Sequence, residues 1–227
     1  MIGNFYPQNK IEDIIVDTGI NQSEVLSSIE EAKVRRKSRV FNLKNEKNAA
    51  FEILVELFRP KIKVVCIGDN YDVIAFISIV HELGWEVHVA GKKRKLSKDV
   101  FNISTSVSEY SEADRIPIDE HTAVILMSHD YKTDYRLLKH FIHIDLPYIG
   151  LLGPKKRMLK MQDELAEEGL NIQLENRLNL FSPVGLDVGA ESPEEIALSV
   201  AAEIVATLRR RDGTPLRKRE GPIHERD

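Results

Sequence analysis

Two apolar runs separated by a helix-length segment constrain the fold of this chain most strongly. Residues 61–67 are rich in β-branched side chains and stop at Gly68, and a second run over 85–90 stops at Gly91. The segment between them, 71–83, repeats its apolar residues at helical spacing. A buried strand, a helix and a second strand joined by glycine turns are typical of the opening unit of a doubly wound sheet.

The same alternation continues toward the C-terminus. Residues 122–127 form an apolar run of the kind that a central parallel strand needs. A proline at the first helical position and a capping box, Ser-Pro-Glu-Glu from Ser192, predict the start of a last helix. We also predict a strand over 146–151, helices over 130–141 and 154–169, one short strand over 101–103, and a connecting loop over 170–191.

This order of elements predicts an α/β fold with a Rossmann-like, doubly wound and mainly parallel sheet over residues 61–211. A small N-terminal region, 1–60, precedes it, and a polar C-terminal tail, 212–227, follows it. Apolar spacing predicts helices over 21–34 and 48–58, so we expect the N-terminal region to be a short helical appendage.

Composition excludes several classes of protein. The 227 residues are 42% hydrophobic and 30% charged, which suits a packed core. The net charge of -4 gives no argument for a nucleic-acid partner, and a single cysteine cannot form an internal disulfide framework. No uncharged apolar run could span a bilayer, and the first residues lack the pattern of a signal peptide. We therefore expect a cytoplasmic protein without nucleic-acid or membrane contacts.

The turn that begins at Gly68 occupies the place of a dinucleotide-binding turn. Such a turn carries three glycines, which let the backbone approach a pyrophosphate. Here only Gly68 is present, and the carboxylate of Asp69 would repel a phosphate. The second strand ends in Ala90-Gly91-Lys92 instead of the acidic residue that would hold a ribose. We keep Gly68 as a candidate binding residue and disfavour NAD(P) as the cofactor.

Ser128, His129 and Asp130 follow the predicted central strand. Open α/β sheets bind ligands outside the carboxyl ends of their strands, and histidine is a common general base. These side chains are therefore candidates for contact with a ligand. The alternative is that His129 and Asp130 merely cap the next helix, and the sequence leaves both interpretations open.

Glycines and cations meet at the start of the helix predicted over 154–169. Gly150 and Gly153 precede three consecutive cations, Lys155, Lys156 and Arg157. Cations at a helix N-terminus oppose the helix dipole, so their presence suggests a bound anion, although a solvated surface is the alternative. Arg157 could make a bidentate contact with a phosphate and would then be the most sensitive residue.

A second glycine loop precedes the last helix. It contains Gly185, Asp187 and Gly189, and it is either a wall of the ligand site or a strained turn without a ligand. Cys66 lies within a strand, where a buried apolar thiol is expected. The histidines show no metal-like spacing. We assign no catalytic residue and expect no metal site made of protein side chains.

Together these segments resemble the XdhC/CoxI family, the xanthine dehydrogenase accessory proteins. The resemblance covers about residues 60–224. The matching segments are, in order, 128–131 with Asp134, 148–153, 155–157, 183–190, 192–199, 202–204 and 221–224.

The resemblance implies a function as well as a fold. It implies a Rossmann-like domain that binds molybdenum cofactor (molybdopterin), protects it while it receives its terminal sulfur, and passes it to an apo-molybdenum hydroxylase such as xanthine dehydrogenase. It also implies a chaperone more than an enzyme, often a homodimer, that cooperates with a cysteine desulfurase. The family's N-terminal domain usually carries a glycine-rich motif with a cysteine, whereas the first 60 residues here contain no cysteine.

The leading hypothesis therefore places a pterin phosphate at the mouth of the sheet. Gly150, Gly153 and the cations 155–157 would supply backbone donors and positive charge on one wall of the site. The second glycine loop, 185–189, would form the opposite wall. The alternatives are an NAD(P)-dependent oxidoreductase with His129 as proton donor and a non-catalytic ligand-sensing module. The candidate residues are Gly68, Ser128, His129, Asp130, Gly150, Gly153, Lys155, Lys156, Arg157, Gly185, Asp187 and Gly189.

Overall fold

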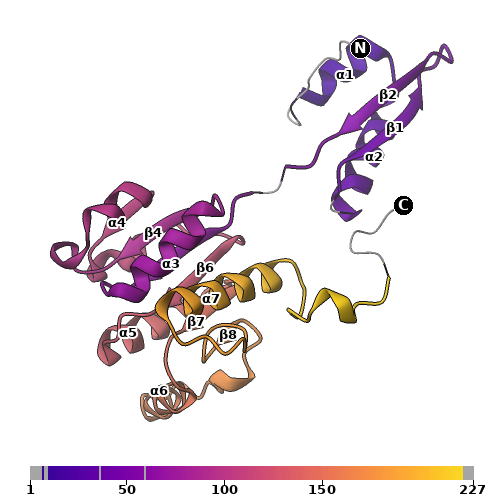
Figure 1. Ribbon diagram of the computed structural model, residues 1–227. Helices are drawn as coiled ribbons and strands as arrows, with labels where there is room; N and C mark the ends of the chain where they lie inside the picture. Colours follow the sequence, from indigo (N-terminus) through magenta and orange to yellow (C-terminus); the bar gives the residue numbers. More distant parts are fainter. Residues whose placement is uncertain (1–6, 8–9, 36, 59, 222–227) are drawn as a thin grey trace. The chain divides into compact units, whose positions relative to one another are not determined.

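The computed structural model describes residues 7, 10–35, 37–58 and 60–221 (Figure 1). By its internal contacts the chain divides into two compact units, Met1–Pro60 and Lys61–Asp227. The expectation for the end of the polar tail, and the part of the family resemblance over 222–224, lie outside the described residues.

In its described residues, the first unit combines two α-helices with a β-hairpin. Helix α2 (Gln22–Arg35) confirms the helix predicted over 21–34. The helix predicted over 48–58 is wrong, because β2 (Ala50–Val55) pairs antiparallel with β1 (Arg39–Lys44). Alternate residues of β2 are exposed and half-buried, which is the two-residue period of a strand. The remaining helix of this unit is α1 (Ile11–Thr18).

The second unit contains a six-stranded parallel sheet. Its strand order is β5-β4-β3-β6-β7-β8, which confirms the Rossmann-like, mainly parallel α/β fold. The strands are β3 (Lys63–Ile67), β4 (Glu86–Ala90), β5 (Ser106–Ser108), β6 (Thr122–Leu126), β7 (Tyr148–Leu151) and β8 (Leu180–Phe181).

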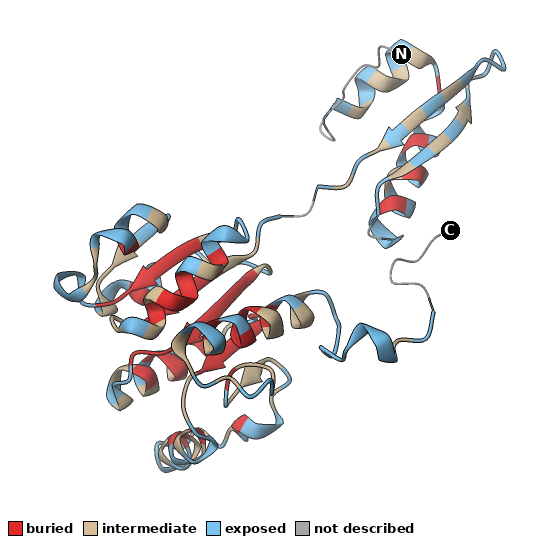
Figure 2. Cartoon of the chain, viewed as in Figure 1, coloured by how far each residue is buried: buried red, intermediate tan, exposed pale blue. Residues whose placement is uncertain are grey.

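Helices cover both faces of this sheet. One face packs against α3 (Tyr71–Glu82), α4 (Lys98–Ile103) and α7 (Pro193–Leu208). The other packs against α5 (Tyr131–Phe141) and α6 (Lys155–Glu167). Every residue of β6 is buried, as the near-continuous apolar run requires, and Figure 2 shows the strands at the centre of the unit as its most buried part.

Edge elements differ from the sequence-based expectation. Residues 101–103 end helix α4 rather than forming a strand, and the edge strand is β5, a few residues later. The stretch predicted as a loop contains β8, which is only two residues long. Such short edge strands leave too few residues for a periodic pattern. The 3₁₀ segments described in the second unit are η2 (Lys93–Lys95), η3 (Tyr110–Arg115), η4 (Leu174–Asn176) and η5 (Leu216–Lys218).

The strand order reverses between β3 and β6, and this topological switch point positions the candidate site. Helices α3 and α5 begin on either side of it, at the carboxyl ends of the two strands. The capping box predicted at Ser192 is present at the start of α7. In the part of the chain that the structure describes, no helix has both the length and the apolar character needed to cross a membrane.

Candidate functional site

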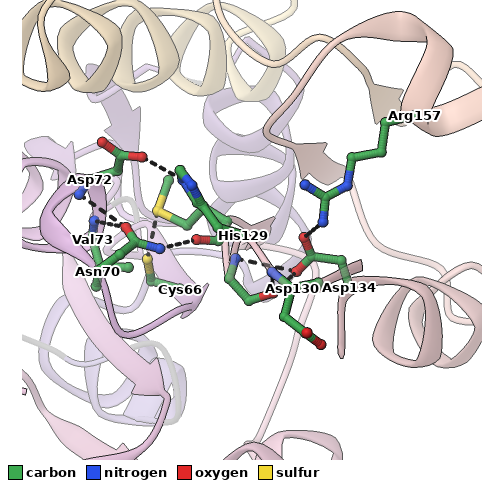
Figure 3. Close-up of polar contacts among 10 residues, drawn as sticks. Cys66, Asn70, Asp72, Val73, His129, Asp130, Asp134 and Arg157 are labelled. Carbon is green, nitrogen blue, oxygen red and sulfur yellow. Dashed lines mark hydrogen bonds and ion pairs between the residues drawn. The ribbon is translucent and has the colours of Figure 1, made fainter. Parts of the chain in front are cut away.

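A buried carboxylate organises the turn after β6. Asp134, fully buried in the first turn of α5, accepts a hydrogen bond from the Ser128 hydroxyl at 2.6 Å and one from the Ser128 backbone N–H at 3.3 Å. Its second oxygen, Oδ2, accepts a hydrogen bond from Nη2 of Arg157 at 2.7 Å (Figure 3). The Ser128 turn, α5 and the start of α6 are therefore joined at a single side chain.

Burial of Asp134 and the contacts that its carboxylate makes shift its pKa in opposite directions. Burial raises the pKa of this carboxyl above its ordinary value, while the hydrogen bond from Ser128 and the charge of Arg157 oppose that rise. Arg157 thus neutralises a carboxylate of the protein itself, instead of being free for the bidentate phosphate contact that its position in the sequence suggests. Its Nε atom is buried and has no hydrogen-bond partner in the described structure.

His129 reaches across the switch point. Its Nε2 atom lies 2.6 Å from Oδ2 of Asp72 in the first turn of α3, so the side chain connects the end of β6 to the start of α3 (Figure 3). The backbone of His129 has a φ of 59°, in the left-handed region that non-glycine residues seldom adopt. The imidazole is still 58% exposed. His129 therefore faces solvent at the mouth of the sheet, where a ligand could meet it.

Asp130 caps helix α5. Its Oδ1 atom accepts a hydrogen bond from the backbone N–H of Thr133 at 2.7 Å. Hydrogen bonding with Thr133 lowers the pKa of Asp130. The capping interpretation that the sequence left open therefore describes Asp130, which is also exposed at the rim.

The N-terminus of α3 is closed by the protein. Asn70 accepts hydrogen bonds from the backbone N–H groups of Asp72 at 3.0 Å and Val73 at 3.4 Å. Its own amide donates to the carbonyl of Met127 at 2.6 Å. In a dinucleotide-binding turn these helix donors would face the pyrophosphate. Here a side chain occupies them, and the carboxylate of Asp72 stands beside them.

Gly68 has a packing role in the same turn. Its backbone N–H donates to the carbonyl of Ala90 at 2.9 Å. A Cβ atom at this position would lie 2.6 Å from Cγ2 of Val73 and 2.7 Å from the carbonyl oxygen of Met127. Gly68 thus lets β3, β6 and α3 approach one another, and its N–H is not available to a ligand.

Helix α6 differs because its first turn is open. Within the described residues, the backbone N–H groups of Lys155 and Lys156 donate to no protein atom, and Pro154 before them offers no capping side chain. Unsatisfied N–H groups and the helix dipole both favour an anion at such an end. Lys155 and Lys156 are also exposed, and Lys156 has no ion-pair partner among the described residues, so at least its positive charge remains available there.

A cavity of about 120 Å³ adjoins this helix start. One water needs only about 10–15 Å³ of such volume, so the cavity has room for a group as large as a phosphate. Ser182, just after β8, lines it, and the Ser182 hydroxyl oxygen is buried without a hydrogen-bond partner among the described residues. The Lys155 ammonium lies 3.8 Å from the carboxylate of Glu175 on another wall. The cavity therefore offers an unused hydroxyl beside a cationic helix start.

The glycines predicted as backbone donors lie elsewhere. Gly150 is inside β7, paired with Ile125 and Phe181, and a Cβ atom there would come 2.7 Å from Cγ2 of Val184. It serves close packing rather than ligand contact. Gly153 lies two residues after the end of β7 and two before α6, and a Cβ atom there would come 3.2 Å from Cδ of Arg157.

The second glycine loop is bound to α7. The backbone N–H of Gly185 donates to Oε2 of Glu203 at 2.9 Å, and the Ser199 hydroxyl donates to the carbonyl of Leu186 at 2.6 Å. Asp187 and Gly189 are exposed. None of these residues lines the cavity at α6. This loop and Arg157 are therefore not two walls of that cavity, and a ligand site shared between them stays a prediction.

The sequence analysis missed three features of the site. One of them, the cap formed by Asn70, does have a local signal, because Asn is a favoured N-cap residue. The partnership of Arg157 with Asp134 spans 23 positions and has no local signal. Ser182 precedes a proline in an irregular segment, and nothing in the sequence indicates that its hydroxyl is buried.

Comparisons with known proteins agree with this fold. The family model described as the XdhC Rossmann domain matches residues 64–204. A probable xanthine dehydrogenase subunit of Bacillus subtilis is 28% identical over 165 residues, covering 70% of this chain and 46% of that protein. The molybdenum cofactor insertion chaperone PaoD of Escherichia coli is 27% identical over 149 residues, covering 66% of this chain and 41% of that protein.

Two further relatives extend the comparison. The uncharacterized protein YqeB of Escherichia coli is 25% identical over 219 residues, covering 90% of this chain and 40% of that protein. A crystal structure of a xanthine dehydrogenase from Bacillus halodurans superposes with a TM-score of 0.58 at 24% identity, covering 74% of this chain and 48% of that one. That likeness shows the fold. The chain spans less than half the length of each of these relatives.

Proposed function

Because the chain belongs to the XdhC family, we propose that it is an accessory protein that binds molybdenum cofactor and assists its insertion into a molybdenum hydroxylase such as xanthine dehydrogenase. Two relatives support this proposal by their names, one a probable xanthine dehydrogenase subunit and the other a molybdenum cofactor insertion chaperone. In this role the protein acts as a carrier, and the chemistry belongs to the recipient enzyme.

The open start of α6 is the observation that carries the proposal. A molybdopterin ends in a phosphate, and a phosphate needs backbone donors, positive charge and a shielded hydroxyl. Lys155 and Lys156 offer the backbone donors, and Lys156 offers a positive charge beside that of Lys155, which is shared with Glu175. Ser182 offers the hydroxyl in a cavity with room for the group. The residues present therefore fit the phosphate end of the cofactor.

Other rim residues have supporting tasks in this proposal. The network of Ser128, Asp134 and Arg157 fixes the turn after β6 against the start of α6. His129 and Asp130 are exposed beside it and can hydrogen-bond the polar edge of a pterin. When bound, the cofactor would bring the molybdenum centre that the recipient enzyme uses, while this chain holds and orients it.

The finer parts of the proposal rest on the family resemblance. We propose that the cofactor receives its terminal sulfur while it is held, with a cysteine desulfurase as the donor, and that the protein acts as a cytoplasmic homodimer. Cys66 is a poor sulfur carrier, because it is fully buried in β3 and burial raises the pKa of its thiol. The sulfur would therefore come directly from the partner.

The nicotinamide-dependent alternative is disfavoured by the start of α3. A pyrophosphate there would have to displace Asn70 and would lie beside the carboxylates of Asp69 and Asp72. The open helix start is at α6, on the other side of the switch point. The geometry thus supports an anion-carrying protein without a dinucleotide turn.

The test is whether the protein carries a pterin. It is purified anaerobically from cells that make molybdenum cofactor, together with a candidate recipient enzyme, and any bound pterin is oxidised to its fluorescent product. We expect pterin with the wild type, a loss of at least ~10-fold with Lys155→Glu, and little change with Lys98→Glu, an exposed cation at the start of α4. Absence of pterin from the folded wild type would contradict the proposal.

A further inference from the structure

A second hollow of the molecule lies at the opposite edge of the sheet and contains a relay of three polar side chains. His88 on β4 and Ser106 on the edge strand β5 are register partners. Glu86 lies two residues before His88, so its side chain is on the same face. None of these residues belongs to the candidate site at α6.

The side chains of the relay lie within hydrogen-bond distance of one another, as in enzymes that activate a serine through a histidine. The Ser106 hydroxyl oxygen lies 2.7 Å from Nδ1 of His88, and Nε2 of His88 lies 2.8 Å from Oε1 of Glu86. An ionised Glu86 can only accept a hydrogen bond, so it fixes the imidazole proton on Nε2. Nδ1 is then left as an acceptor for the Ser106 hydroxyl. Nucleophile, base and orienting carboxylate are thus in the order that serine acyl transfer requires.

The base and the nucleophile of the relay differ in their exposure to solvent. His88 is 7% exposed, whereas Ser106 is exposed. The base is therefore held rigidly beneath the surface, while the hydroxyl can be reached from solvent. Both residues line a hollow of about 360 Å³, whose other lining residues are Ser108, Glu112, Arg115, Ile116 and Pro117. One acidic and one basic side chain thus stand beside an apolar pair, and the volume suits a small molecule with an apolar part.

We propose that Ser106 is a nucleophile and that this hollow is a site for hydrolysis of small carboxylic esters. The Ser106 oxygen attacks the ester carbonyl while its proton passes to Nδ1 of His88. The bond to the leaving oxygen breaks, and that oxygen takes the proton from Nδ1. Water then attacks the acyl carbon and gives a proton to Nδ1, the bond between that carbon and the Ser106 oxygen breaks, and the Ser106 oxygen takes the proton back. The balance is ester plus water to acid plus alcohol.

The roles of the remaining residues follow from their positions. Glu86 is a positioning residue, because it acts through His88 and stabilises the imidazolium that forms. Ile116 and Pro117 contact the apolar part of the substrate. This activity goes beyond the proposed function, and its success or failure leaves the site at α6 untouched.

The experiment labels the nucleophile directly. The full chain is treated with a fluorophosphonate probe, the labelled residue is located by mass spectrometry, and hydrolysis of 4-nitrophenyl acetate is followed in parallel. We expect labelling at Ser106 that disappears in Ser106→Ala and is slowed at least ~100-fold in His88→Gln. Ser111→Ala removes an exposed hydroxyl on the neighbouring η3 segment and should label like the wild type.

Glu86→Gln separates a chemical role from a structural one. Glutamine keeps the shape and an acceptor oxygen, so a structural role predicts unchanged labelling, whereas loss of the charge predicts labelling slowed at least ~10-fold. Circular dichroism confirms that each variant is folded. If the folded wild type is not labelled at Ser106, or if His88→Gln is labelled as fast as the wild type, the proposal is overturned.

Discussion

The guanidinium of Arg157 lies 2.7 Å from the fully buried carboxylate of Asp134. Through this contact the start of α6 is joined to α5 and to the Ser128 turn, which Asp134 also holds. The arginine that the sequence marks as a phosphate ligand is therefore a clamp within the protein. Substitution of Arg157 should mainly lower the stability of the fold, whereas substitution of Lys155 or Lys156 should mainly weaken ligand binding.

Arg157→Met should lower the free energy of unfolding by about 3 kcal/mol at pH 7, because it leaves a buried carboxylate without its partner. Methionine keeps an apolar stem of similar length, so the change isolates the charge. Chemical denaturation measures the difference. Asp134→Asn in the same background is the control, since it removes the unpaired charge and should recover part of the loss.

The stability lost in Arg157→Met should depend on pH. Burial already raises the pKa of Asp134 in the folded state, and removing Arg157 raises it further. The folded variant then binds a proton more readily than the unfolded chain, so its stability falls as pH rises through the folded pKa. We expect a smaller loss relative to the wild type at pH 5 than at pH 8. An equal loss at both values would show that Asp134 is not the unpaired group.

Asn70→Ala should destabilise the protein by about 1–2 kcal/mol, because it removes the cap of α3 and the hydrogen bond to Met127. It also frees the helix donors that a dinucleotide would use. We still expect no binding of NADH in a fluorescence titration, because Asp69 and Asp72 remain beside those donors. Micromolar affinity in either the variant or the wild type would reopen the nicotinamide alternative.

Two substitutions of His129 should differ in stability. Both His129→Ala and His129→Gly lose the contact with Asp72, but only alanine keeps a Cβ in the left-handed backbone conformation, where φ is 59°. The glycine variant should therefore be more stable by about 0.5–1 kcal/mol, after allowing for its more flexible unfolded chain. Equal midpoints and slopes in urea would contradict the backbone geometry described for His129.

The second glycine loop should respond unequally to alanine. At Gly185 φ is 106° and a Cβ atom would lie 2.6 Å from the Ser199 hydroxyl, so Gly185→Ala combines strain with overpacking and should lose about 2–4 kcal/mol. At Gly189 φ is 73° and nothing lies within 4 Å, so Gly189→Ala should lose only about 1 kcal/mol. Thermal unfolding shows which of the two variants loses more stability. A larger loss in Gly189→Ala than in Gly185→Ala would mean that the loop does not pack on α7 as described.

The central strands can be predicted because each is long enough to show its pattern. β3, β4 and β6 are mostly buried and rich in β-branched residues, β7 is buried throughout, and a parallel sheet follows from helices between them. The hairpin strand β2 is easily mistaken for a helix, because the apolar residues of 50–55 fit a helical period as well as an alternating one. Its pairing with β1 decides the outcome, and pairing is not a local property.

The position of the candidate site can be predicted from the sequence, but the roles of its individual residues are harder to predict. The carboxyl ends of the strands and the cations of α6 follow from the order of elements. Which cation is free does not follow, because Arg157 meets Asp134 only after two helices have packed. Likewise, the Asn70 side chain closes the N-terminus of α3, whereas the N-terminus of α6 has no such cap. The spacing of residues in the sequence does not determine this difference.

The most direct test of the central claim compares the two helix starts in one experiment. Backbone amide NMR shifts of the ¹⁵N-labelled chain are followed during titration with inorganic phosphate, with chloride at matched ionic strength as the control. If the anion site is where we place it, saturable shifts will be largest at Lys155 and Lys156 and small at Asp72 and Val73. Shifts centred on Asp72 and Val73, or none beyond those caused by chloride, would contradict the account.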